Sequence, residues 1–217
     1  GEEPVLAPAF IDAWGTVLTD EELDPSLVSL ALALPAESYL SESFEVLDPG
    51  HVHAARKAAR AQLASAHASA LREVRARNYT AEAYSADKVS IAKRSLANTC
   101  LAFLTGLEES EDVAACVAQF EAADNMTDSF AALACLSDIA GPERDSTLAS
   151  FYERWKEEPL VVNKWFALQA LSDLEDTVER VTELAKHSDF TLKNPNRANS
   201  LIGCFGINSA HFHRPDG

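Results

Sequence analysis

Histidines are the residues of this chain most suited to binding a metal ion, and four of them form two His-X-His pairs, His51/His53 and His211/His213. Side chains two positions apart on an α-helix point about 200° away from each other, so the first pair cannot hold one ion if a helix begins at Pro49. Neither pair has carboxylates or thiols at a spacing typical of zinc ligands. We therefore expect no metal site and no cofactor within this chain.

Other catalytic motifs are missing from the sequence as well. It contains no Gly-X-Ser-X-Gly nucleophile turn, no phosphate-binding glycine loop and no cysteine beside a suitable histidine. The acidic runs Asp20–Glu22 and Glu157–Glu158 stand next to turns, where solvated loop charges are more typical than an acid–base pair. The sequence thus predicts no catalytic residue in this chain.

Arg197 follows Asn194-Pro195-Asn196, a pattern that predicts a helix capped by Asn194 with Pro195 at its first position. An arginine in the first turn is unfavourable by a few tenths of a kcal/mol, up to about 1, because that end of a helix is already positive. Such a residue can bind an anion, for example a peptide carboxylate, in a bidentate manner. The simpler alternative is an exposed arginine, or one paired with a neighbour such as Asp189.

Apolar residues recur at helical spacing almost everywhere, and no alternating strand pattern of useful length occurs. We therefore expect one all-α domain over residues 1–217, with stacked helix pairs that form a curved, solenoid-like superhelix. The predicted segments are Ala9–Leu18, Pro25–Ala33, Glu37–Phe44, one long helix from Pro49 past Val74, Val89–Leu107 with Ser85 as its cap, Glu111–Ala123 after Ser110, Asp128–Ile139 after Thr127, Glu143–Lys156, a helix from Pro159, Asp176–Lys186, and a helix from Pro195 toward Gly203 and Gly206.

Composition excludes several classes of partner. Asp and Glu number 34 against 18 Lys and Arg, giving a net charge of −16, so neither a nucleic acid nor an anionic membrane is an expected partner. No apolar run approaches the roughly 20 residues of a membrane span, and no signal peptide is visible. The cysteines fit buried free thiols in the cytoplasm or another reducing compartment; they are Cys100, Cys116, Cys135 and Cys204.

Several short sequence words occur together and in a fixed order in the second half of the chain. They are Asn125–Asp128, Leu160–Gln169, Asn194–Arg197, Ser200–Gly203, and Phe212-His213 followed by Asp216-Gly217. In combination they resemble the C-terminal helical domain of the aminopeptidase N (alanyl aminopeptidase) family of zinc exopeptidases, in particular its bacterial and plant types. No histidine here is followed by glutamate, so the His-Glu-X-X-His zinc helix of that family is not in this chain.

The resemblance implies a parent enzyme that uses zinc to remove N-terminal residues from peptides. It implies that this chain encloses the substrate chamber without being catalytic, and that its partners are the parent's catalytic domain and peptide substrates. Arg197, Asn194 and Asn196 would then line the substrate channel. Bacterial members carry a second basic residue two positions after the arginine, where this chain has Asn199, so a clamp of two arginines is not expected.

The family continues beyond Asp216-Gly217 with further helices. We therefore expect this chain to be a fragment that lacks the upstream catalytic domains and the final C-terminal helices. The alternative hypothesis is an independent helical-repeat scaffold that binds protein partners.

Overall fold

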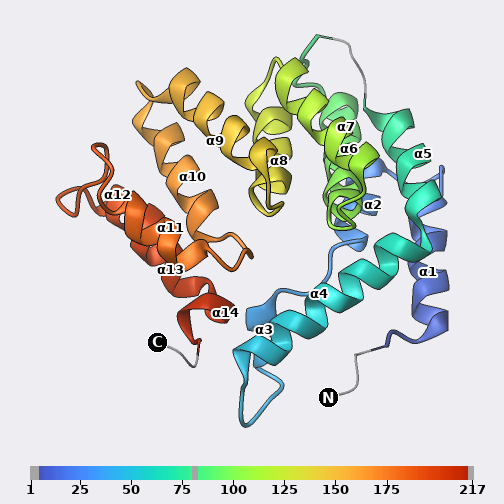
Figure 1. Ribbon diagram of the computed structural model, residues 1–217. Helices are drawn as coiled ribbons and strands as arrows, with labels where there is room; N and C mark the ends of the chain where they lie inside the picture. The colour runs from blue at the N-terminus through green and yellow to red at the C-terminus, as the bar shows by residue number, and fades with distance from the viewer. Residues whose placement is uncertain (1–4, 80–82, 215–217) are drawn as a thin grey trace. The chain divides into compact units, whose positions relative to one another are not determined.

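The computed structural model describes residues 5–79 and 83–214, which form helices and turns and, in these ranges, no strand (Figure 1). The all-α prediction is therefore confirmed. Among these residues no helix is both long and apolar enough to cross a membrane. Asp216-Gly217, part of the resemblance above, lie outside the described residues.

The helices are α1 (Pro8–Thr19), α2 (Pro25–Ala31), α3 (Glu37–Ser41), α4 (Pro49–Ala66), α5 (Ala68–Asn78), α6 (Lys88–Thr105), α7 (Ser110–Ala122), α8 (Met126–Ser137), α9 (Pro142–Trp155), α10 (Pro159–Ala170), α11 (Thr177–Leu184), α12 (Pro195–Ala198), the π-helix η1 (Asn199–Gly203), α13 (Cys204–Ile207) and α14 (Ser209–Phe212).

The chain separates into two compact units. Unit 1 comprises Gly1–Leu47 with His51–Cys135, and unit 2 comprises Asp48–Gly50 with Leu136–Gly217. Each unit has buried apolar side chains of its own. That residues 1–217 act as one domain stays a prediction.

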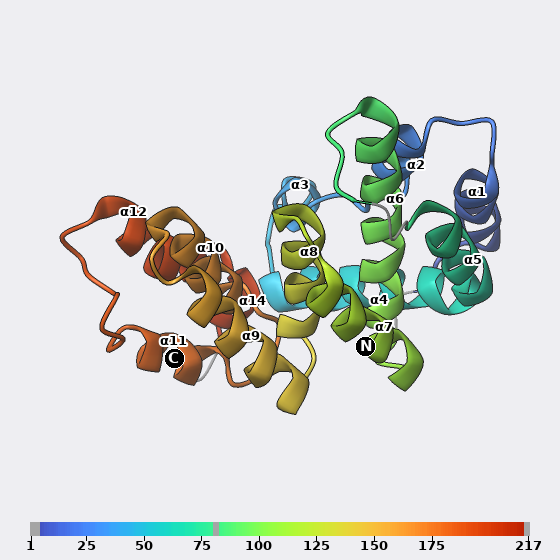
Figure 2. The same ribbon diagram turned by 90° about the horizontal axis from the view of Figure 1, so that it is seen from above.

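In unit 1 the helices α2 and α5 both pack against α6, and α1 packs against α5 (Figures 1 and 2). Trp14 of α1 belongs to the buried core of this unit, with its ring centroid 5.0 Å from that of Phe103. Its indole N–H donates to the carbonyl oxygen of Leu32 at 3.2 Å, so the one polar atom of this buried ring is satisfied.

His67 divides the long helix that the apolar spacing predicts, so the expectation of one helix from Pro49 past Val74 is wrong. Its backbone leaves helical geometry with φ −122° and ψ 22°, and α5 begins at the next residue. The imidazole packs so closely on α1 that a Cβ at Gly15 would lie 2.2 Å from its Cε1. His67 Nε2–H donates to the carbonyl oxygen of Ile11 at 2.9 Å. The close packing of His67 on α1 therefore accounts for the break between α4 and α5.

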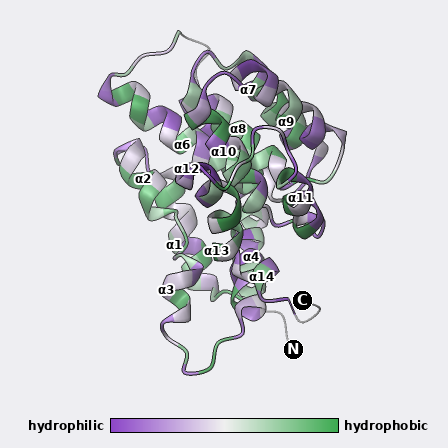
Figure 3. Ribbon diagram, turned by 90° about the vertical axis from the view of Figure 1, so that its left-hand side faces the viewer, coloured by the Kyte–Doolittle hydropathy of each residue, from purple (hydrophilic) through white to green (hydrophobic). Residues whose placement is uncertain are grey.

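In unit 2 the helix α10 is the common neighbour, since α9, α11, η1 and α13 all pack against it. Its residues Val162, Trp165 and Phe166 are buried, and the Trp165 indole N–H donates to the carbonyl oxygen of Leu148 on α9 at 2.9 Å. Hydrophobic and hydrophilic residues both colour these helices, as amphipathic helices require (Figure 3).

Three predicted helix caps differ in the structure. At α7 the residue Ser110 is the first residue of the helix, and Glu109 occupies the N-cap position. Asp87, rather than Ser85, caps α6, because its carboxylate accepts the N–H of Ser90 at 3.0 Å. At α8 the residue Asn125 has this role, since its amide oxygen accepts the N–H of Asp128 at 3.0 Å and the helix begins before Thr127.

The cysteines are all free, as expected, but they are not equally buried. Cys100 and Cys116 are fully buried, whereas Cys135 and Cys204 are half-buried. Burial is the main cause that raises the pKa of Cys100 to about 12, so this thiol is unreactive at neutral pH.

Candidate anion-binding site

The start of α12 in unit 2 has the predicted form. Asn194 is the N-cap, and its side-chain oxygen accepts the backbone N–H groups of Asn196 at 3.0 Å and Arg197 at 3.3 Å. Pro195 occupies the first position, where its missing N–H has no cost. The helix has only four residues before η1 continues it, so the dipole argument for an anion near Arg197 is weaker than the sequence suggests.

The guanidinium of Arg197 is buried, with the side chain only 7% exposed. It lies over the ring of Phe166 on α10, with Cζ 5.1 Å from the ring centroid. Nη2 is 3.5 Å from the carbonyl oxygen of Pro159, a long and weak hydrogen bond. Nη1 is buried without any hydrogen-bond partner. Arg197 is therefore neither exposed nor, within the described residues, paired with a carboxylate, so both alternatives from the sequence analysis are wrong.

Burial is the main cause that lowers the pKa of Arg197, and the negative charge of Asp189 works in the opposite direction. An arginine remains charged despite such a shift. A buried cation with an unmet N–H is costly unless an anion or a polar acceptor reaches it. The arrangement is thus suited to receiving a carboxylate.

Asp189 is held by its neighbours rather than by Arg197. Tyr152 of α9 donates its hydroxyl proton to Asp189 Oδ2 at 2.6 Å, and this hydrogen bond is the largest cause that raises the pKa of Tyr152 to about 12. The backbone N–H of Asp189 donates to Nδ1 of His187 at 3.1 Å. The His187 ring contacts the rings of Tyr152 and Trp165 at centroid distances of 5.0 and 5.4 Å.

The structure therefore brings Arg197 over Phe166 of α10 and close to Tyr152 and Asp189. Tyr152 and Asp189, which are hydrogen-bonded to each other, are 37 residues apart in the sequence. Asn194 is committed to the helix cap, and the side chain of Asn196 is exposed. Of the three predicted channel residues, only Arg197 has a buried side-chain polar atom without a hydrogen-bond partner.

Carboxylates gather in unit 1 at Glu109, Glu111 and Asp112, the one group of three or more possible metal ligands in the described ranges. Nη2 of Arg72 lies 2.6, 2.9 and 2.6 Å from an oxygen of each. The charge of the group is already compensated by this guanidinium, and no histidine belongs to it. These residues do not fit a zinc site, so no step of zinc chemistry is assigned to them.

A family model described as "Domain of unknown function (DUF3458_C) ARM repeats" matches residues 1–217, the whole chain. The chain belongs to this family. ARM repeats are stacked helices, which confirms the predicted helical-repeat class.

Curated relatives of this ARM-repeat domain carry the name Aminopeptidase N. The chain is 39% identical over 217 residues to the protein from Escherichia coli (strain K12) and 37% identical over 209 residues to that from Caulobacter vibrioides. These matches cover 99% and 96% of this chain but only 25% and 24% of the relatives.

A solved structure, Legionella pneumophila aminopeptidase A in complex with aspartic acid, matches with a TM-score of 0.82 and 29% identity, covering 94% of this chain and 25% of that one. The expected membership of the C-terminal helical domain of aminopeptidase N-type enzymes is therefore confirmed. The chain spans about a quarter of the length of the relatives it matches.

Proposed function

We propose that this chain is the non-catalytic, chamber-enclosing part of a zinc aminopeptidase, and that Arg197 binds the C-terminal carboxylate of peptide substrates. The single observation that carries the second part is the buried Arg197 guanidinium with no partner at Nη1. Each relative named above is an aminopeptidase, which favours this function over an independent scaffold. When bound in the rest of the enzyme, zinc would supply the activation of the attacking water.

In this proposal the residues of unit 2 position and orient the peptide. A carboxylate above Phe166 would accept from Nη1 of Arg197 and would replace the weak bond to Pro159. Asp189 stands near enough to oppose a second anion electrostatically, and its Oδ2 accepts the hydroxyl proton of Tyr152 in a hydrogen bond. A location in the cytoplasm or another reducing compartment is part of the same proposal.

The test measures the complete enzyme that contains this chain, on a tripeptide with a free carboxylate and on the same tripeptide amide. We expect Arg197→Met to raise KM for the free tripeptide roughly 10- to 100-fold, the worth of a charge-assisted hydrogen bond, and to leave the amide unchanged. Arg154→Met is the matched control, because Arg154 is an exposed arginine that lies over Trp155 in the same unit.

Equal effects of Arg197→Met on both tripeptides, or no effect on either, would overturn the role of Arg197. The non-catalytic assignment is tested separately with the purified chain and an alanyl fluorogenic reporter. We expect no turnover above buffer, and turnover that a zinc chelator abolishes would contradict the assignment.

A further inference from the structure

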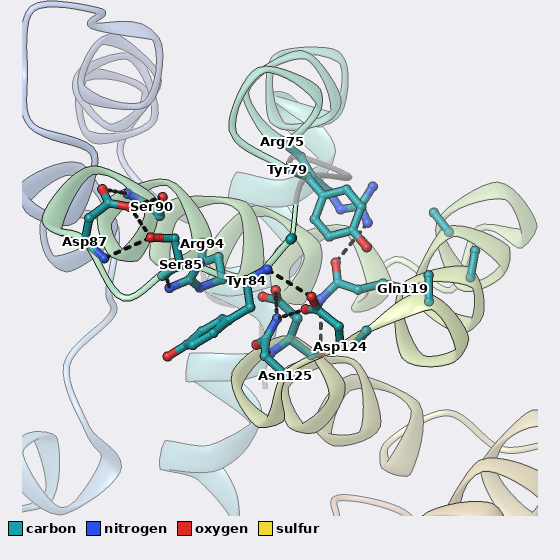
Figure 4. A pocket seen from close by; sticks show the side chains of 16 residues that line it. Arg75, Tyr79, Tyr84, Ser85, Asp87, Ser90, Arg94, Gln119, Asp124 and Asn125 are labelled. Carbon is teal, nitrogen blue, oxygen red and sulfur yellow. Dashed lines mark hydrogen bonds between the residues drawn. The ribbon is translucent and has the colours of Figure 1, made fainter.

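Unit 1 contains a pocket of about 590 Å³ that the proposed function does not use (Figure 4). Its walls come from the end of α5, residues 83–87, the first turns of α6, the last turns of α7 and the start of α8. Its volume lies in the range of small-molecule sites. Its lining carries both signs of charge, two arginines and three aspartates.

Two arginines of the lining each lie over a tyrosine ring. The Cζ atom of Arg75 is 5.0 Å from the centroid of Tyr79, and that of Arg94 is 4.6 Å from the centroid of Tyr84. Arg75 Nη2 donates to the side-chain oxygen of Gln119 at 3.1 Å, and Arg94 Nη2 donates to a backbone carbonyl at 2.6 Å.

Both acceptors are neutral, and within the described ranges neither guanidinium forms an ion pair with a carboxylate. Other arginines of this chain behave differently, since Arg72 and Arg144 each contact aspartates. Arg75 and Arg94 therefore keep their capacity to bind a carboxylate.

The aspartates of the lining differ in what their oxygens already bind. Asp87 accepts from the hydroxyl groups of Ser85 and Ser90 and caps α6, and Asp128 accepts from the amides of Asn98 and Asn125. These two carboxylates are committed to the fold.

Asp124 is exposed at the pocket, where it accepts the amide of Asn125 at 3.0 Å and the backbone N–H of Tyr84 at 2.9 Å. These bonds, with that of Asn125 the larger, lower the pKa of Asp124, so it is negatively charged at neutral pH. Each of its oxygens accepts one hydrogen bond and has a further lone pair for another donor.

The remaining wall of the pocket is apolar and consists of small side chains. Ala115, Ala118 and Ala122 of α7 line one side, and small side chains there leave room for a ligand body. Tyr84 is 50% exposed, so its ring is covered by Arg94 only in part and can stack on a further flat group.

We propose that this pocket binds a small zwitterion, a free α-amino acid or short peptide, with its carboxylate on Arg75 and Arg94 and its ammonium group on Asp124. A simple anion would face three carboxylates and a simple cation two guanidiniums, whereas a zwitterion matches both. The side chain of the ligand lies over the alanines of α7 and against Tyr84. The argument is independent of the role of Arg197, although the proposed aminopeptidase reaction releases molecules of this class.

The test is an NMR titration of the purified chain with the common amino acids and a series of dipeptides. We expect saturable shifts of signals from residues 83–94 and 115–125 with at least one zwitterion. For that ligand, the analogue amidated at the carboxylate and the analogue lacking the amino group should both bind at least tenfold more weakly. No saturable binding, or equal binding of the three molecules, would overturn the proposal.

Variants locate the site. Arg94→Gln and Asp124→Asn should each weaken binding at least tenfold, while Arg154→Gln, far along the sequence in unit 2, should not. Ala118→Leu fills the pocket and keeps every charge, so it also should abolish binding. Ala114→Leu is its matched control, because Ala114 is exposed on the same helix but does not line the pocket. Binding that survives Ala118→Leu as well as Ala114→Leu would place the ligand elsewhere and contradict the proposal.

Discussion

The cores of the two units use the same side-chain arrangement. In unit 1 the ring of Phe103 lies against Trp14, and a guanidinium, that of Arg60, stands 5.0 Å above it. In unit 2 the ring of Phe166 lies against Trp165, and the guanidinium of Arg197 stands 5.1 Å above it. A histidine ring also contacts the tryptophan in each, at 5.6 Å in unit 1 and 5.4 Å in unit 2.

The difference lies in what the guanidinium does beyond the ring. Arg60 is half-buried and donates to the carbonyl oxygen of Ala102, whereas Arg197 is buried and leaves Nη1 without a partner. Arg60 over Phe103 is thus a packing device, whereas Arg197 over Phe166 is a candidate site. In this pair of cores the unmet hydrogen bond of Arg197, rather than the cation–π contact that both arginines make, marks the difference.

Truncating the two phenylalanines should have the largest effect on stability. Phe166 is 0% exposed and Phe103 is 6% exposed. Each change to alanine should lower the free energy of unfolding by about 3–5 kcal/mol in urea denaturation. We expect Phe166→Ala at the lower end, because water entering its cavity can accept from Nη1 of Arg197.

The control is Phe10→Ala, at a ring that is 47% exposed, with an expected loss below about 1 kcal/mol. A loss at Phe103 no larger than that at Phe10 would show that the two cores are not equivalent.

Replacing Arg60 and Arg197 by methionine should distinguish unit 1 from unit 2, with smaller changes in the free energy of unfolding than the phenylalanine truncations. Arg60→Met removes a charge-assisted hydrogen bond and should cost about 1–2 kcal/mol. Arg197→Met removes a buried, poorly satisfied charge and should leave stability unchanged or raise it by about 1 kcal/mol. Both are measured by urea denaturation. A loss above about 2 kcal/mol at Arg197 would mean that its charge is satisfied within the fold.

The smallest expected effect is a dependence of the free energy of unfolding on alkaline pH, which originates at Tyr152 in unit 2. The folded-state pKa of Tyr152 is raised from 10.0 to about 12, mainly by the hydrogen bond to Asp189. Its contribution to stability is therefore present below pH 10 and is lost as the pH rises toward 12.

Tyr152→Phe should make the loss of stability above pH 10 less steep. The measurement compares the free energy of unfolding of the variant and of the unmodified chain between pH 10 and 12. Identical slopes for both proteins would contradict the hydrogen bond to Asp189. Glu143→Gln, at an exposed position of the same helix, should keep the slope of the unmodified chain, because Glu143 is not among the groups that shift the pKa of Tyr152.

Local sequence predicted those features that depend on neighbouring residues. The cap at Asn194 and the proline after it act within one turn, so the start of α12 could be placed from the sequence alone. His67 could not be recognised as a helix break, because its partner Ile11 is 56 residues away. The burial of Arg197 depends likewise on Phe166 and on the bond from Tyr152 to Asp189, which spans 37 residues.

The π-helical turn after Arg197 determines where this region tolerates a change of chain length. In η1 the N–H of Cys204 donates to the carbonyl oxygen of Asn199, five positions back, so the turn holds one residue more than an α-helical turn. Removing one residue there lets a regular α-helix form without rotating what precedes or follows it, whereas a deletion in α10 rotates the rest of that helix by about 100°. Single-residue gaps between related sequences should therefore collect at 199–203, and Arg197 should keep its direction across them.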